Sequence, residues 1–248
     1  MIAIRGLRKR LGEKQVLDGV DLDIETGQTV VVLGPSGTGK SVLLKHIVGL
    51  MKADAGSIEV DGEEVVGRPE RELNVIRRRF GMLFQGAALF DSLSVGENVA
   101  LPLREHTDMA EADIRARVSE RLDWVGLKGI EDTLPASLSG GMRKRVGLAR
   151  AVAMDPAFIL YDEPTTGLDP IMSAVIDELI RGLQQRIHLT SIVVTHDLRS
   201  AFAVGDRIAM LLNGRILMKG TPDELRASTD PIIRQFLEGT SEGPIQPV

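Results

Sequence analysis

The clearest chemistry in the sequence lies in one glycine-rich run, Gly34-Pro35-Ser36-Gly37-Thr38-Gly39-Lys40-Ser41. The run fits the phosphate-binding pattern G-x-x-x-x-G-K-[ST] at every specified position. Its glycines permit positive φ angles, so successive N–H groups can point into one concavity that cradles an anion. Lys40 adds a positive charge for the β- and γ-phosphates, and the Ser41 hydroxyl is a hard oxygen ligand suited to Mg²⁺. We therefore expect a nucleotide site here.

The segments around this run favour a phosphate loop over an ordinary glycine-rich turn. Residues 28–33 are rich in β-branched side chains and predict a short strand. Residues 42–50 have the apolar spacing of a helix face. A helix that begins at the loop directs the positive end of its dipole at the anion.

Composition bounds the classes of protein to which the chain can belong. The 248 residues, 43% of them hydrophobic, suffice for one large domain or two lobes. A net charge of -5 argues against a nucleic-acid surface. The sequence contains no cysteine, which excludes disulfides and thiolate metal sites. We see no signal peptide and no apolar run near the ~20 residues that cross a bilayer, so we expect membrane contact only through a partner.

The order of the remaining patterns predicts how the chain is organised. Residues 1–25 alternate as antiparallel strands do, and residues 86–156 have helical periodicity, with Thr107 or Asp108 capping a helix that ends at Trp124. Trp124 is interpreted as a core anchor of this helical lobe. Strand-helix repeats from residue 158 to residue 195 imply a parallel sheet. Asn213-Gly214 predicts a tight hairpin, and the tail from Gly239 cannot fold alone.

Two acids directly follow a buried apolar run, residues 158–161. Ligands of open α/β sheets bind at the carboxyl ends of the strands, so Asp162 is placed to hold Mg²⁺, directly or through water. The alternative for Asp162 is a helix N-cap. Gln85 ends another predicted strand just before the helical lobe, where its amide could contact Mg²⁺ or water; otherwise it is an ordinary polar residue at a junction.

A second anion site is predicted where Ser139-Gly140-Gly141 opens a helix over residues 142–154. The first turn of a helix has free N–H groups and a positive dipole end. The basic run Arg143-Lys144-Arg145 adds field at that place or is simply solvated.

Taken together, these segments resemble ABC-type ATPase subunits along essentially the whole chain. The resemblance rests on the phosphate loop, Gln85, Leu138-Ser139-Gly140-Gly141-Met142, Asp162-Glu163, Gly167-Leu168-Asp169 and His196 in this order. It implies an α/β P-loop NTPase with a RecA-like, mostly parallel sheet, an antiparallel β subdomain and an inserted helical subdomain. We expect the ATP-binding core in residues 1–85 and 157–238, the helical subdomain in residues 86–156 and a tail in residues 239–248.

The resemblance also implies the chemistry, with ATP and Mg²⁺ as cofactors. Glu163 resembles the catalytic carboxylate that orients the attacking water, and His196 resembles the histidine that contacts the γ-phosphate. In the family, two subunits close head to tail, so that the Ser139-Gly140-Gly141 loop covers the ATP of the other subunit. Asp169 would then lie across that interface.

Two positions depart from the usual pattern of the family. Met142 stands where the commonest signature has glutamine. Leu11 stands where an aromatic side chain usually stacks on adenine. Loss of stacking removes about 1 kcal/mol or more of base affinity, so we expect weaker nucleotide binding or looser base selectivity.

Within the family, the chain is most similar to the ATPases of Mla-type phospholipid transport systems. Residues 82–90, residues 98–106, Met142 and residues 234–244 carry this similarity. It implies a peripheral subunit on the cytoplasmic side of the inner membrane, working with an MlaE-like permease, an MCE-domain protein and a small STAS-type accessory subunit. The surface after Gln85 would receive a permease helix, and the tail would pack on the neighbouring subunit.

Three alternatives stay open. The chain could serve an importer of a small polar solute. It could be a soluble ABC ATPase acting on DNA or ribosomes, although no coiled coil or tandem ATPase domain is visible. It could also be a structural subunit without hydrolysis, although Lys40, Asp162, Glu163 and His196 are all present.

Overall fold

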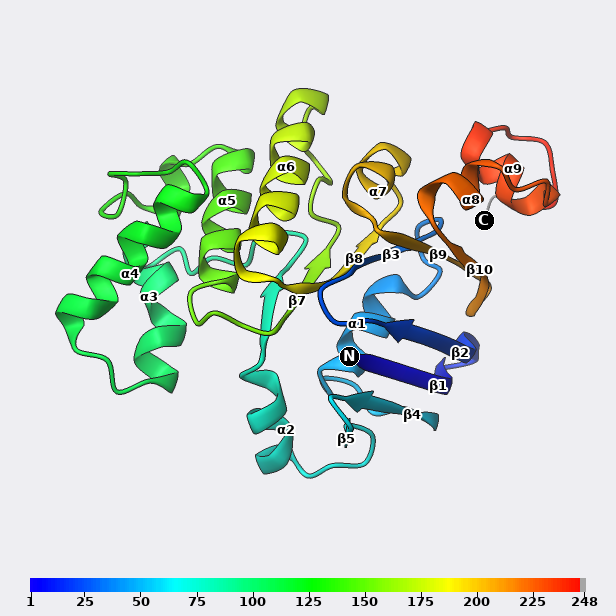
Figure 1. Ribbon diagram of the computed structural model, residues 1–248, viewed down its shortest axis with the longest axis horizontal. Helices are drawn as coiled ribbons and strands as arrows, with labels where there is room; N and C mark the ends of the chain where they lie inside the picture. The colour runs from blue at the N-terminus through cyan, green and yellow to red at the C-terminus, as the bar shows by residue number, and fades with distance from the viewer. Residues whose placement is uncertain (246–248) are drawn as a thin grey trace. The chain divides into compact units, whose positions relative to one another are not determined.

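The computed structural model describes residues 1–245, and its helices and strands divide between two units. Unit 1 comprises residues 1–68 and 193–248, and unit 2 comprises residues 69–192. The lobe boundaries expected from the sequence, at 85/86 and 156/157, both fall inside unit 2 and stay a prediction. Figure 1 traces the elements along the chain by colour.

Unit 1 contains an antiparallel sheet with the strand order β2-β1-β4-β5. Its strands are β1 (Ile2–Leu11), β2 (Lys14–Ile24), β4 (Ala55–Val60) and β5 (Glu63–Glu64). Ile4 pairs with Leu22 and Leu7 with Val20, and all four side chains are buried. The predicted antiparallel strands are therefore confirmed, with the alternation that a sheet with one buried face requires.

Unit 1 also holds strands of a second, six-stranded sheet. The fully buried β3 (Thr29–Leu33) pairs in parallel with β9 (Arg207–Leu212), and β9 pairs antiparallel with β10 (Arg215–Gly220). Asn213 and Gly214 have φ angles of 48° and 75°, which confirms the predicted hairpin turn. Helix α1 (Lys40–Ile47) lies between the antiparallel sheet and β3 (Figure 1).

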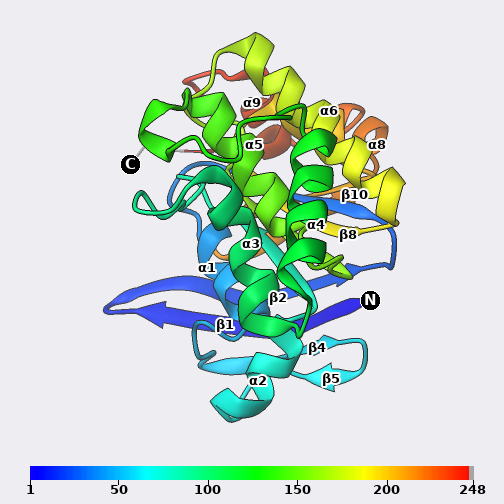
Figure 2. The ribbon, with the colours of Figure 1, turned by 90° about the vertical axis from the view of Figure 1, so that its left-hand side faces the viewer.

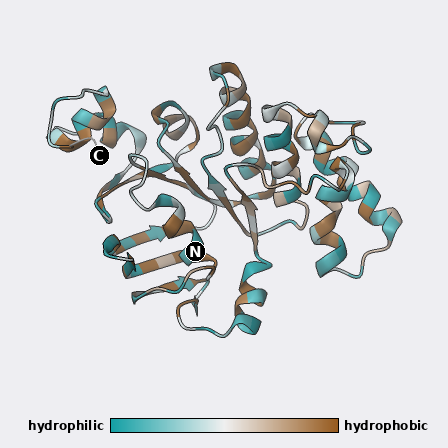
Figure 3. Cartoon of the chain, turned by 180° about the vertical axis from the view of Figure 1, so that it is seen from behind, coloured by the Kyte–Doolittle hydropathy of each residue, from teal (hydrophilic) through white to brown (hydrophobic). Residues whose placement is uncertain are grey.

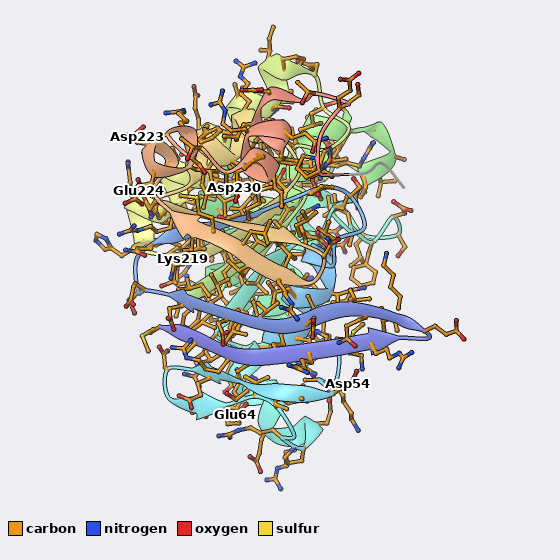
Figure 4. The ribbon with its side chains drawn as sticks, turned by 90° about the vertical axis from the view of Figure 1, so that its right-hand side faces the viewer. Asp54, Glu64, Lys219, Asp223, Glu224 and Asp230 are labelled. Atoms are coloured by element: carbon orange, nitrogen blue, oxygen red, sulfur yellow. The ribbon has the colours of Figure 1, made fainter. Side chains whose placement is uncertain are left out.

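Three further helices complete unit 1: α7 (Leu198–Val204), α8 (Pro222–Arg226) and α9 (Pro231–Glu238). Figure 4 labels Asp230 at the start of α9. Its carboxylate accepts hydrogen bonds from the backbone N–H groups of Ile232, at 2.8 Å, and Ile233, at 3.3 Å, which caps the helix.

Unit 2 combines two parallel strands with a group of helices. Strands β6 (Phe80–Leu83) and β7 (Phe158–Asp162) belong to the six-stranded sheet, and the rings of Phe80 and Phe158 stack with centroids 4.9 Å apart. The helices are α2 (Glu70–Arg77), α3 (Val95–His106), α4 (Glu111–Trp124), α5 (Gly140–Ala151) and α6 (Pro170–Ile187), with a short 3₁₀ turn, η1 (Pro135–Ser137). Helices α3, α4 and α5 lie side by side (Figure 2). Strand β8 (Thr190–Thr195) contains the boundary between the units.

The predicted cap of the helix that ends at Trp124 is wrong. Helix α4 begins at Glu111, and its N-cap residue is Ala110, which has no side-chain hydrogen bond. Thr107 instead ends the preceding helix, where its hydroxyl donates to the carbonyl oxygen of Leu103 at 2.7 Å. A strong capping box at Ser94 starts that preceding helix.

Trp124 is half-buried and does not sit inside an apolar core as expected. The guanidinium carbon of Arg121 lies 3.6 Å from the ring centroid of Trp124, and that of Arg186 lies 4.9 Å away. The ring therefore anchors the helical part of unit 2 through cation–π contacts.

The strands β3, β7 and β9 consist mostly of buried hydrophobic residues, and many helices mix hydrophobic and hydrophilic residues along their length (Figure 3). Among the described residues, no helix combines the length and the apolar character needed to cross a bilayer.

Candidate functional site

The phosphate loop of unit 1 is closed by hydrogen bonds from its own side chains. The ammonium group of Lys40, 5% exposed, donates to the carbonyl oxygens of Gly34 and Pro35, each at 2.9 Å. The hydroxyl of Thr38 donates to the carbonyl oxygen of Pro35 at 2.9 Å. These contacts draw the loop around its lysine, directly before the first turn of α1.

Two glycines of the loop are required by space, and one of them, Gly39, also by conformation. A Cβ on Gly34 would lie 2.2 Å from the carbonyl oxygen of Leu211. Gly39 has a φ of 99°, and a Cβ there would lie 2.8 Å from Cγ1 of Val16. Gly37 has a φ of 76° but faces open space. The glycines that the pattern specifies at 34 and 39 thus let the loop pack against β9 and β2.

The other candidate residues of unit 1 are His196 and Leu11. Both are exposed, His196 between β8 and α7 and Leu11, with 43% of its surface exposed, at the end of β1. His46, on α1, is 1% exposed, and its Nδ1–H donates to the carbonyl oxygen of Val42 at 2.7 Å. Burial lowers the pKa of this imidazole, which favours the neutral ring.

In unit 2, the two candidate acids lie at the end of β7. Asp162 is the last residue of the strand, and Asp162 and Glu163 are 9% and 7% exposed. Glu163 has a φ of 49°, a conformation that is costly for a residue with a side chain. The hydroxyl of Thr166 donates to Oε2 of Glu163 at 3.1 Å. A strained backbone and a held carboxylate together fix the direction of the Glu163 side chain.

Lys144 connects the Glu163 segment with Gln85. Its ammonium group donates to the carbonyl oxygen of Glu163 at 3.1 Å and also to the carbonyl oxygen of Gln85. Lys144 is 5% exposed, so the solvated reading of this residue is wrong. Burial lowers the pKa of its amino group, and the charges of Asp162 and Glu163 act in the opposite direction. One buried cation of α5 therefore joins the two sequence-predicted segments of unit 2.

Arg150, also on α5, holds the loop that follows Gln85. Its guanidinium donates to the carbonyl oxygens of Ala87 and Ala88, each at 2.7 Å. These alanines have φ angles of 62° and 49°, so the backbone is strained at the two residues to which Arg150 donates. From the sequence, Lys144 is expected only to add to the field at the anion site or to be solvated, and Arg150 is assigned no role.

The Ser139-Gly140-Gly141 segment opens α5, and helix formation begins two residues earlier than expected. The Ser139 hydroxyl accepts from the backbone N–H of Met142 at 3.2 Å. A Cβ on Gly141 would lie 2.6 Å from the Met172 side chain, so the segment packs closely on α6. Asp169 caps α6 by accepting from the N–H groups of Ile171 and Met172, at 2.9 and 3.0 Å. The Ser139-Gly140-Gly141 segment and the Asp169 segment are thus neighbours.

Comparison with known proteins matches both parts of this site. The family model described as ABC transporter matches residues 17–166. The chain is 46% identical, over 98% of its length, to the probable ribonucleotide transport ATP-binding protein mkl of Mycobacterium leprae, of which it covers 70%. It is 41% identical, over 99% of its length, to the intermembrane phospholipid transport system ATP-binding protein MlaF of Haemophilus influenzae, of which it covers 93%.

A solved structure gives the same result for the fold. The dimeric ATP-binding cassette MJ0796, in a post-hydrolysis state bound to ADP and Pi, matches with a TM-score of 0.82 and 34% identity. The match covers 90% of this chain and 99% of that chain.

Proposed function

The chain belongs to the ABC transporter family, and from this premise we propose that it is the ATP-hydrolysing subunit of a system that moves phospholipid between membranes. Its fold is that of the ABC ATPase cassette, and its activity is ATP hydrolysis. The observation that carries the lipid assignment is the likeness to MlaF of Haemophilus influenzae, which spans 99% of this chain and 93% of that protein. A match over both whole lengths includes the surfaces that meet partners, not only the nucleotide motifs.

We assign the nucleotide chemistry residue by residue. The loop 34–41 binds the phosphates of ATP, with Lys40 neutralising their charge. Glu163 orients and polarises the attacking water, and His196 contacts the γ-phosphate. Gln85 senses the nucleotide at the start of a loop that Arg150 keeps strained.

The residues proposed to hold Mg²⁺ fit this ion by their chemistry. The Ser41 hydroxyl, the Gln85 amide and the Asp162 carboxylate are all hard oxygen donors, which Mg²⁺ prefers. Asp162 also stands at the carboxyl end of β7, where ligands of open α/β sheets bind. When bound, the ion neutralises charge on the phosphate oxygens.

We propose that the subunit works as a closed, two-fold dimer. Ser139-Gly140-Gly141 offers the first-turn N–H groups of α5 to the ATP of the partner subunit, and Asp169 lies beside this segment at the interface. The MJ0796 cassette is a dimer in its ADP-bound and Pi-bound state, which supports this arrangement.

An apolar groove in unit 2 supports docking of a permease. The cavity, of about 460 Å³, lies in the segment after Gln85 and between β6, α3 and α5. Phe84 and Phe90 line it and are 39% and 53% exposed. Exposed aromatic side chains that line a groove are typical of a surface that receives a partner helix. The subunit would then act as a peripheral protein on the cytoplasmic side of the inner membrane, beside an MlaE-like permease, an MCE-domain protein and a STAS-type subunit.

A second candidate function is transport of a ribonucleotide or another small polar solute. The relative from Mycobacterium leprae, at 46% identity, is named for ribonucleotide transport, although this chain covers only 70% of it. The nucleotide chemistry would be unchanged, and only the permease and its cargo would differ.

The deciding experiment is capture of tagged Glu163→Gln protein from its native membrane in detergent, with mass spectrometry of bound proteins and lipids. We expect an MlaE-like permease, an MCE-domain protein and phospholipid. Phe90→Ser should lose the permease, whereas Leu134→Ser, a matched control at 51% exposure outside the groove, should retain it. Recovery of a solute-binding protein with a different permease would overturn the lipid assignment.

A further inference from the structure

The chain after α9 turns back and is fastened to that helix by one side chain. Gln235 is 7% exposed, and both the nitrogen and the oxygen of its side-chain amide form hydrogen bonds. Its Nε2–H donates to the carbonyl oxygens of Ile245, at 3.0 Å, and Thr240, at 3.3 Å. Its Oε1 accepts from the backbone N–H of Ile245 at 2.6 Å. A buried amide is costly unless it is paired, so this pairing fixes the position of residues 240–245 on their own chain.

Gly243 permits the close approach. Its φ is 151°, and a Cβ at this position would lie 2.4 Å from Cδ of Gln235. A larger residue would force either this segment or the amide of Gln235 to move, and either shift would disturb their hydrogen bonds. The tail therefore has a sequence requirement of its own, made of one glutamine and one glycine.

The fastened segment forms part of the wall of a cavity beside the phosphate loop. The cavity, of about 550 Å³, is lined by residues 35–38 of the loop, by residues 14–16 of β2, by the hairpin turn after β9, and by Ile232, Pro244 and Ile245. Its size lies in the range of small-molecule sites. Every lining residue belongs to unit 1.

The lining divides into a charged side and an apolar side. The loop supplies N–H groups, and the side chain of Lys14 forms no hydrogen bond or ion pair within residues 1–245, so its charge is available to an anion. Val16, Ile232, Pro244 and Ile245 supply apolar surface. Leu11, which stands at the usual place of the stacking aromatic residue, does not line the cavity. A molecule with phosphates at one end and an apolar body at the other matches this division.

We propose that Pro244 and Ile245 form the apolar wall against which the base and ribose of the bound nucleotide lie, on the same chain as the phosphate loop. The tail then supplies contact that an aromatic residue at position 11 would otherwise give. Gln235 is a positioning residue, because it acts only by holding Ile245. The tail does not plug the site, since the cavity is present with the tail fastened. This inference rests on the nucleotide site and is independent of the transported cargo.

The test is equilibrium binding of ADP and of inorganic pyrophosphate, at protein concentrations where light scattering shows a monomer. The two probes share their phosphates and differ by the adenosine. Gln235→Leu, which keeps the apolar stem and removes the fastening, should weaken ADP binding about five- to tenfold and leave pyrophosphate binding unchanged. Gly243→Ala should do the same, and the exposed neighbour Glu242→Gln should bind both probes as the wild type does.

Other results would overturn the proposal. Unchanged ADP affinity in both tail variants would mean that the tail does not contact the nucleotide, and tighter ADP binding would mean that it covers the site. Equal weakening of ADP and pyrophosphate would place the effect at the phosphate loop. Retained pyrophosphate binding shows that a variant is folded, and a Lys40→Ala control should weaken both probes.

Discussion

The phosphate loop of unit 1 and the Glu163 segment of unit 2 are both held by a buried lysine, but the two lysines act over different distances along the chain. Lys40 donates to carbonyl oxygens five and six residues before it. Lys144 donates to the carbonyl oxygen of Glu163, nineteen residues later, and to that of Gln85, fifty-nine residues earlier. The loop is thus held by local contacts, and the carboxylate segment by tertiary contacts.

This difference explains why the phosphate loop can be recognised in the sequence, whereas the contacts that hold the Glu163 segment cannot. A local device has fixed spacing, so its residue types form a recognisable pattern. The contacts of Lys144 form only when α5, the end of β7 and the loop after Gln85 have come together in the fold. In the sequence alone, the basic residues of α5 look like those of a solvated helix face.

The largest expected effect concerns the space behind the phosphate loop. Gly37→Ala adds only the cost of a left-handed backbone, about 1–2 kcal/mol. Gly39→Ala adds a similar backbone cost and an overlap with Val16, about 1–3 kcal/mol more. Urea unfolding of both variants gives the difference in free energy of unfolding. Equal losses in the two variants would show that the loop does not pack against β2 as described.

A smaller effect on stability, combined with an effect on kcat, is expected when the contacts of Lys144 to Glu163 and Gln85 are removed. Lys144→Met should lower the free energy of unfolding by about 1–3 kcal/mol, because two carbonyl oxygens lose their donor. It should lower kcat about ten- to a hundredfold, because the Glu163 carboxylate loses its position. ATP affinity should stay near that of the wild type. The exposed Lys128→Met is the matched control, and an unchanged kcat in Lys144→Met would remove its positioning role.

The smallest effect is a pH dependence that belongs to unit 1 alone. Burial lowers the pKa of His46 below its ordinary value of 6.5, so the unfolded chain takes up a proton before the folded chain does. The stability that His46 contributes is complete above about pH 6.5 and is lost as the pH falls toward the folded pKa. Unfolding measured from pH 8 to pH 5.5 should show a loss of about 1 kcal/mol or less that is absent in His46→Gln. An identical pH dependence in the variant would contradict this.

Local patterns allowed much of the fold to be predicted. The hairpin at Asn213-Gly214 follows from two residues that tolerate positive φ. The buried strand before Asp162 follows from its apolar run. The start of α4 could not be predicted in this way, because Thr107 and Asp108 are good capping residues but Thr107 is used to end α3. Competition between two adjacent helix ends is decided by packing.

The candidate site divides in the same manner. The glycines of the phosphate loop, the acids at the end of β7 and the Ser139-Gly140-Gly141 segment were all proposed from local residue types. Lys144, Arg150 and the Gln235 fastening were not, because each acts on a carbonyl oxygen that any residue type would supply. When a side chain bonds to a backbone group, only the residue that supplies the side chain is restricted in type. A single sequence does not reveal a restriction on one residue.

The role of Glu163 as the catalytic carboxylate is tested most directly by ATP hydrolysis and ATP binding of Glu163→Gln beside the wild type, with Glu178→Gln on the exposed face of α6 as control. Glu163→Gln should bind ATP normally while its kcat falls about 10²- to 10⁴-fold, and Glu178→Gln should behave as the wild type. Normal hydrolysis by Glu163→Gln would contradict the assignment of Glu163 as the catalytic carboxylate. It would also contradict the positioning role of Lys144, which holds the Glu163 segment.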